Sequence, residues 1–116
     1  MDLGKLRAEY LARLEASLRK AVTMLSALPG VRGILLFGSY ARGQRDLFTD
    51  LDLIVIMESD EDFLSRTARV YEYLDFPVDA DVLVYTPEEF AALRERPFFR
   101  RALREGKVLH EKGRVF

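Results

Sequence analysis

Apolar residues near the start of the chain recur at steps of three and four. Side chains with this spacing share one face of a helix, so the pattern predicts a helix from Leu3 to Leu28. Pro29 and Gly30 end it. The apolar face of this helix comprises Leu3, Leu6, Tyr10, Leu14, Leu18, Val22, Leu25 and Leu28.

Two segments that follow have the length and apolar content of strands. Residues 31–37 are mostly apolar and end abruptly in Gly38 and Ser39. Residues 50–57 first alternate acids with Leu and then become continuously apolar. The second segment is therefore expected to be a strand that is wet at its start and buried later.

The second half of the chain alternates helices with strands. Ser59, followed by three acidic residues, predicts the N-cap of a helix that reaches Leu74, and Thr86-Pro87-Glu88-Glu89 predicts a capping box with Pro at the first helical position. The remaining segments are a strand over 78–85, helices over 87–93 and from Pro97 to Gly106, and a strand over 107–110. This order predicts an α/β (α+β) fold, in which helices pack against a small mixed sheet.

Composition limits the classes of function. The chain has 116 residues, 49% of them hydrophobic and 32% charged, so we expect one globular domain over residues 1–116. Eighteen basic and nineteen acidic residues give a net charge of -1, which makes nucleic acid a poor partner. Cysteine is absent, and no apolar run approaches the length of a membrane span. We therefore expect a cytoplasmic protein whose chemistry uses oxygen and nitrogen groups.

Two short motifs carry that chemistry. Asp50 and Asp52 are two apart on a predicted strand, so their carboxylates should share a face and a cation; Mg²⁺ favours carboxylate together with phosphate oxygens. Gly38 and Ser39 follow another strand and can begin a short helix whose free N–H groups attract phosphate. Each motif alone is weak, but ten residues between them, with both at strand ends, is a specific arrangement.

This pattern resembles the signature of the DNA polymerase β-type nucleotidyltransferase superfamily, and the chain is similar to its minimal nucleotidyltransferases (MNT). Gly-Ser-Tyr-Ala-Arg-Gly, Asp-Leu-Asp-Leu and Tyr-Thr-Pro-Glu-Glu-Phe carry the resemblance, which extends over about residues 31–111. One departure is Thr49, where Ser is commoner before the first Asp. The resemblance implies a palm-like nucleotidyltransferase fold and a third carboxylate from a later strand. Asp81 is favoured by its spacing from Tyr85, with Asp79 as the alternative.

The resemblance also implies a mechanism. Asp50, Asp52 and Asp81 would hold Mg²⁺, Gly38 and Ser39 would bind the distal phosphates of ATP, and Asp81 would help to deprotonate an acceptor hydroxyl. Arg42, between the two motifs, is either a phosphate ligand or a member of a surface ion pair. Prokaryotic relatives pair with HEPN-domain proteins as antitoxins, which implies a toxin-like partner, labelled on a tyrosine, and a homo- or hetero-oligomer.

Two other functions remain open. The chain could be a non-catalytic antitoxin that neutralises its partner by binding alone, or it could transfer a nucleotide to a small molecule. The intact Gly-Ser and Asp-x-Asp motifs favour the enzyme, because binding alone makes no demand for a metal-binding geometry.

Overall fold

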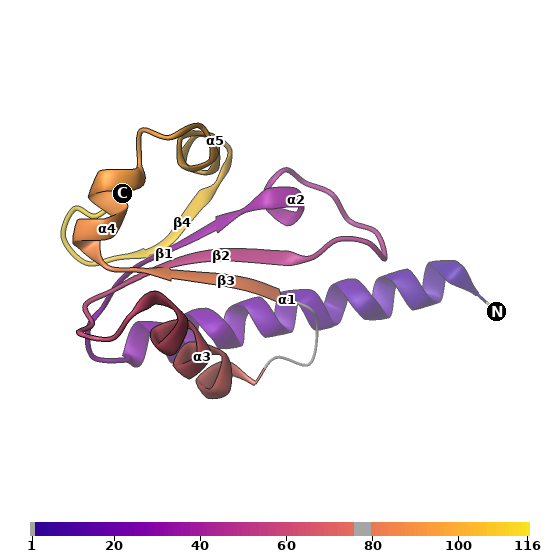
Figure 1. Ribbon diagram of the computed structural model, residues 1–116. Coiled ribbons are helices and arrows are strands. Elements are labelled where there is room, and N and C mark those ends of the chain that lie inside the picture. The colour runs from indigo at the N-terminus through magenta and orange to yellow at the C-terminus, as the bar shows by residue number, and fades with distance from the viewer. Residues whose placement is uncertain (1, 76–79) are drawn as a thin grey trace.

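A mixed sheet forms the centre of the molecule, as the order of elements predicts (Figure 1). The computed structural model describes residues 2–75 and 80–116, and within them four strands lie in the order β3-β2-β1-β4. Neighbours β1–β2 and β1–β4 are antiparallel, whereas β2 and β3 are parallel. The strands are β1 (Val31–Phe37), β2 (Leu51–Met57), β3 (Ala80–Tyr85) and β4 (Lys107–Glu111).

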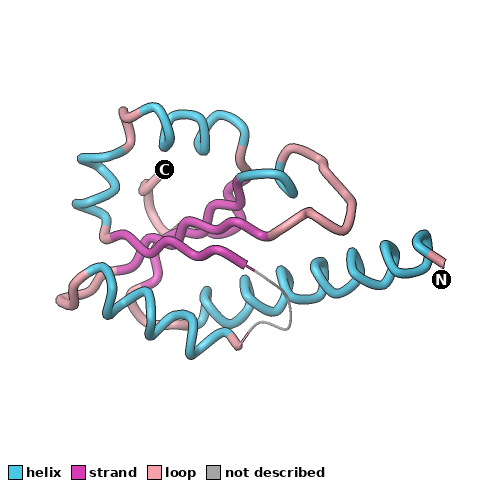
Figure 2. Tube along the Cα trace, turned by 45° about the vertical axis from the view of Figure 1, so that its right-hand side comes forward, coloured by secondary structure: helices cyan, strands magenta, loops and turns pink. Residues whose placement is uncertain are grey.

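Helices cover both faces of the sheet (Figures 1 and 2). On one face lie α1 (Leu3–Ala27) and α3 (Phe63–Leu74), and on the other α4 (Pro87–Leu93) and α5 (Pro97–Glu105). Alternate residues of β2 pack into the two cores, Leu53 toward α1 and α3 and Ile54 toward α4 and α5. Burial on both sides explains why the end of this strand is continuously apolar.

The first helix extends beyond the sheet at its N-terminal end (Figure 1). Leu14 and Leu25 on its apolar face are fully buried, whereas Leu3 and Leu6 at the start of the same face are exposed. The predicted helix is therefore confirmed, but among the described residues its apolar face is covered only from about its third turn onward.

The predicted cap of the third helix is wrong. Asp62 is the N-cap of α3, and its side chain accepts a hydrogen bond from the backbone N–H of Ser65. The Ser59 hydroxyl instead accepts from the N–H of Glu61. A run of four polar residues offers several caps with the same chemistry, and the chain needs the first of them to turn from β2 toward α3.

The capping box at the start of α4 is confirmed. The N–H of Glu89 donates to the Thr86 hydroxyl at 3.1 Å, and the N–H of Thr86 donates to the Glu89 carboxylate at 2.9 Å. These reciprocal bonds fix where β3 ends and α4 begins.

Candidate active site

Two of the predicted carboxylates lie on adjacent strands. Asp52, in β2, is in register with Asp81 of β3 on one side and with Phe37 of β1 on the other. Asp50 lies just before β2 rather than within it, so the expectation that both residues of the motif are in the strand is met only by Asp52. The alternative third carboxylate, Asp79, lies outside the described residues.

The electrostatics of Asp52 reflect this crowding. Its pKa is raised from 3.8 to about 6, first by burial, then by the negative charges of Asp81 and Asp50, and also by a hydrogen bond with Asp81. The positive charge of Arg42 acts in the opposite direction. The carboxyl group of Asp52 is therefore the centre of the predicted site, with Asp50, Asp81 and Arg42 around it.

Gly38 is required by the shape of this site. It has a φ of +77°, a region that side-chain-bearing residues rarely adopt. A Cβ atom added here would lie 2.2 Å from the Oδ2 atom of Asp52. The first residue of the Gly-Ser motif thus touches the second carboxylate of the Asp-x-Asp motif, because β1 and β2 are antiparallel and the end of one strand meets the start of the other.

Gly38 and Ser39 open a one-turn helix, α2 (Gly38–Ala41), which ends at Arg42. The guanidinium of Arg42 lies 3.8 Å from the Glu105 carboxylate of α5, an acid that also binds Arg101 at 2.7 Å. Arg42 therefore forms the surface ion pair that is one of its two predicted roles, and its positive charge also lowers the pKa of Asp52.

The loop that leads to Asp50 is held by contacts of Thr49 that the sequence motifs do not indicate. Thr49 is fully buried, its hydroxyl accepts from the N–H of Asp46, and its carbonyl accepts from the Tyr10 hydroxyl of α1 at 2.7 Å. The buried hydroxyl explains why Thr can stand where Ser is commoner. The steps of three and four place Tyr10 on the apolar face of the helix, but nothing in the sequence indicates its partner.

The carboxylates of this site favour a divalent cation but do not supply a complete set of ligands for it. Asp52 has unfavourable interactions with Asp50 and Asp81 that a cation would relieve. Among residues 2–75 and 80–116, however, no three His, Asp or Glu side chains are already gathered as a metal site. The donor set therefore suits a cation that takes its remaining oxygens from substrate phosphates, as Mg²⁺ does.

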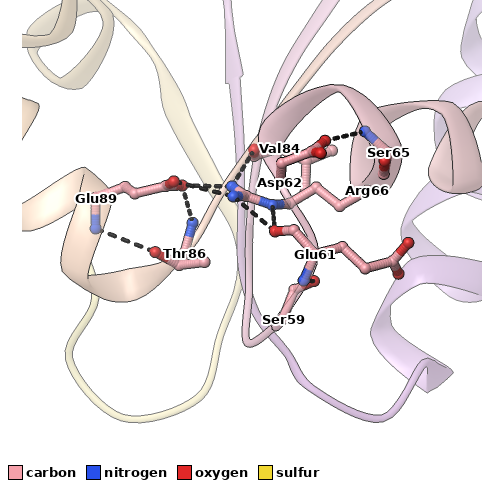
Figure 3. A network of polar contacts seen from close by, with 8 residues as sticks. All are labelled: Ser59, Glu61, Asp62, Ser65, Arg66, Val84, Thr86 and Glu89. Carbon is pink, nitrogen blue, oxygen red and sulfur yellow. Dashed lines mark hydrogen bonds and ion pairs between the residues drawn. The ribbon is translucent and has the colours of Figure 1, made fainter.

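A second polar cluster lies at the opposite ends of β2 and β3 (Figure 3). Arg66 of α3, only 2% exposed, binds both carboxylate oxygens of Glu89 and donates to the carbonyls of Glu61 and Val84. Every direction of the guanidinium is thus filled by this chain. The cluster joins α3 to the start of α4, so we assign it a structural role.

A cavity of about 520 Å³ is near this second cluster, between the ends of α1 and β2 and the second half of α3. None of the predicted site residues lines it. A smaller pocket of about 130 Å³ adjoins the site and is lined by Gly38, Arg42 and residues of α5.

Known proteins are similar to this chain in sequence and in fold. A family model described as a nucleotidyltransferase domain matches residues 18–110. A protein of Methanocaldococcus jannaschii, named putative protein adenylyltransferase, is 31% identical over 80 residues, which are 69% of this chain and 79% of that protein.

Two solved structures are similar in fold. A toxin-antitoxin crystallised with AMP-PNP has a TM-score of 0.53 and 22% identity, covering 85% of this chain and 74% of the other. A variant of the toxin-antitoxin MntA-HpeT has a TM-score of 0.50 and 24% identity, covering 85% of this chain and 73% of the other.

In this chain, no helix of the described part is long and apolar enough to cross a membrane.

Proposed function

Because this chain belongs to the family of nucleotidyltransferase domains and is a nucleotidyltransferase, we propose that it transfers AMP from ATP to a tyrosine hydroxyl of a HEPN-domain toxin. Mg²⁺ is the proposed cofactor, and neutralisation of the toxin is the proposed outcome. The relative from Methanocaldococcus jannaschii, whose name is that of a protein adenylyltransferase, supports AMP as the group and a protein as the acceptor. The toxin-antitoxin neighbours, one of them with AMP-PNP, support the partner and the nucleotide.

One observation carries the proposal. The Asp52 carboxyl is packed against the α-carbon of Gly38 and beside Asp81, so both motifs meet in one place. A protein that acted by binding alone would have no need to keep a destabilised carboxyl against a glycine in the left-handed region. This arrangement favours catalysis over the non-catalytic alternative.

The proposed roles follow from the positions of the residues. Asp50, Asp52 and Asp81 would hold Mg²⁺, whose charge offsets the negative charge of the phosphates during transfer. The backbone at Gly38, the Ser39 hydroxyl and Arg42 would bind the distal phosphates. To bind a phosphate oxygen, Arg42 would release Glu105. The 3.8 Å between the Arg42 guanidinium and the Glu105 carboxylate is a loose ion pair, which makes this exchange easy.

The transfer itself exchanges one bond to phosphorus for another. Asp81 would accept the proton of the acceptor hydroxyl, and the oxygen would then attack the α-phosphorus of ATP. As this P–O bond forms, the bond between the α-phosphorus and the bridging oxygen breaks, and pyrophosphate leaves with the electron pair. The products are the AMP ester of the acceptor and pyrophosphate.

Incubation with α-labelled ATP, Mg²⁺ and a HEPN-domain protein from the same organism tests this function. We expect label on a tyrosine of that protein, none after chelation of the metal, and none with Asp50→Asn or Asp52→Asn. Asp60→Asn, which changes an exposed carboxylate beyond the far end of β2, should label normally. Neutralisation of the toxin without label, preserved in Asp52→Asn, would establish the binding module instead.

A further inference from the structure

An unusual apolar surface lies beside the site. Four large side chains from the start of α1 and from the loop before β2 are exposed among the described residues, and Phe48, at 86%, is the most exposed large hydrophobic residue of that part of the chain. Isolated exposed apolar residues are common, but a group of them marks an interaction surface. We refer to this group as the helix–loop patch; its members are Leu3, Leu6, Leu47 and Phe48.

The two halves of the patch are joined by the fold. A hollow of about 270 Å³ lies between them and is lined by Leu3, Arg7, Leu47 and Phe48, among others. The bond from the Tyr10 hydroxyl to the carbonyl of Thr49 fastens the helix to the loop just behind the hollow. In Figure 1 α1 passes beneath this loop, and its first turns extend beyond the starts of β2 and β3.

The chain holds Phe48 in its exposed position. Its N–H donates to the Asp46 carboxylate at 2.8 Å, and the same carboxylate oxygen interacts with the Thr49 hydroxyl. The backbone on both sides of the exposed ring is therefore fixed by hydrogen bonds. A fixed apolar anchor loses little conformational entropy when a partner covers it.

The patch is also close to the proposed chemistry. Phe48 precedes Asp50 by two residues, so their Cα atoms are at most about 7 Å apart. A partner seated on Phe48 would therefore reach the entrance of the site, near the carboxylates that hold the metal in the proposed function. A small acceptor would gain nothing from such a surface, whereas a protein acceptor would.

The charges around the patch specify the partner further. Residues 2–13 and 42–48 contain five basic and three acidic side chains, although the whole chain has an excess of acids. Arg7 lines the hollow, and it forms no ion pair with another described residue. A second copy of this chain would bring the same positive charges to the contact, whereas an acidic rim would complement them.

We propose that the helix–loop patch is the docking surface for the protein acceptor, which presents an apolar segment to Phe48 and Leu3 and a carboxylate to Arg7. This inference rests on the proposed function, since it takes the acceptor to be a protein. Docking here places the acceptor hydroxyl beside the site and gives this small domain its acceptor specificity.

The test compares two exposed apolar residues. Phe48→Ser should raise the KM of AMP transfer to the HEPN-domain protein about tenfold or more, with kcat and the affinity for AMP-PNP and Mg²⁺ unchanged. Leu64→Ser removes a side chain on α3 that is 77% exposed and should leave all three values unchanged. Arg7→Glu should weaken the complex, and raised salt should weaken that of the unaltered chain more than that of the variant.

Complex formation, measured by sedimentation, separates this proposal from the proposed function. A complex that depends on Phe48 but carries no label would overturn the transfer activity and support the docking surface. Equal KM and equal complex formation for Phe48→Ser and Leu64→Ser would overturn the docking surface. It would also be overturned if no complex formed, or if the chain alone formed a dimer that Phe48→Ser dissolved.

Discussion

Replacing Asp52 by Asn should have opposite effects on activity and on stability. The variant loses the carboxylate that is central to the proposed metal site, so we expect it to transfer no nucleotide. It also loses a carboxyl whose pKa is raised to about 6 by burial and then by the charges of Asp81 and Asp50. The metal-free fold should therefore be more stable with Asn at this position at neutral pH.

The shift of the pKa gives the magnitude of this gain. Between 3.8 and about 6 the folded chain retains a proton on Asp52 that the unfolded chain has lost. Each unit corresponds to about 1.4 kcal/mol, so the limit is about 3 kcal/mol. Because Asp52 is partly exposed, screening by solvent reduces the expected gain to about 1–2 kcal/mol.

The pH dependence of this stability difference follows from proton linkage. The carboxyl favours folding below the unfolded pKa, and this contribution is lost as pH rises through the folded pKa. Ionised Asp52 therefore lowers the stability of the unaltered chain by the full amount above about pH 6, and this loss fades as pH falls toward 4. The difference between the two proteins should be largest at neutral pH and should disappear near pH 4.

Thermal unfolding in EDTA across this pH range measures the difference. We expect Asp52→Asn to melt about 4 °C or more above the unaltered chain at neutral pH. Glu72→Gln, which removes an exposed carboxylate from α3, should show no such pH-dependent gain. If Asp52→Asn melts at or below the unaltered chain, with a gap that does not change with pH, then the crowding at Asp52 is not as described.

Three further variants test the fold, at the site and at the second polar cluster. Gly38→Ala should abolish transfer, since its Cβ would displace the Asp52 carboxylate. Gly43 also has a positive φ, but a Cβ added there would meet nothing within 4 Å. Gly43→Ala should therefore lower the free energy of unfolding by about 1 kcal/mol in chemical denaturation and stay active. Transfer activity in both glycine variants would contradict the contact between Gly38 and the Asp52 carboxylate. Glu89→Gln leaves the buried Arg66 without its counter-charge and should lower stability by about 2 kcal/mol. Because the Glu89 pKa is lowered to about 2, the unaltered chain should lose this stability as pH falls from about 4.5 toward 2, and an equal loss in the variant would refute this.

Much of the fold could be predicted because each element carries a local signal. Steps of three and four give α1, continuous apolar runs give β1 and β2, and the Thr86 capping box gives the start of α4. The cap of α3 could not be chosen in this way, because Ser59 and Asp62 have the same capping chemistry and only the path from β2 to α3 distinguishes them.

The residues of the candidate site come from the sequence, whereas the contacts between them come only from the structure. Spacing alone indicates that Asp52 and Gly38 matter, but their contact depends on β1 and β2 being antiparallel and in register. The bond from Tyr10 to Thr49 spans 39 residues, and no local pattern encodes a pair so far apart. Exposure of Phe48 likewise depends on the path of the loop, since a sequence cannot show which apolar residues the fold leaves uncovered.

The position of the transferred label tests the central claim most directly. ATP labelled on the α-phosphorus or on the γ-phosphorus would be incubated with this chain, Mg²⁺ and the HEPN-domain protein. Transfer of AMP predicts that only the α-label becomes bound to a tyrosine, in step with release of pyrophosphate, and that Asp52→Asn abolishes both. Label from the γ-phosphorus, or equal α-labelling with Asp52→Asn, would contradict the account.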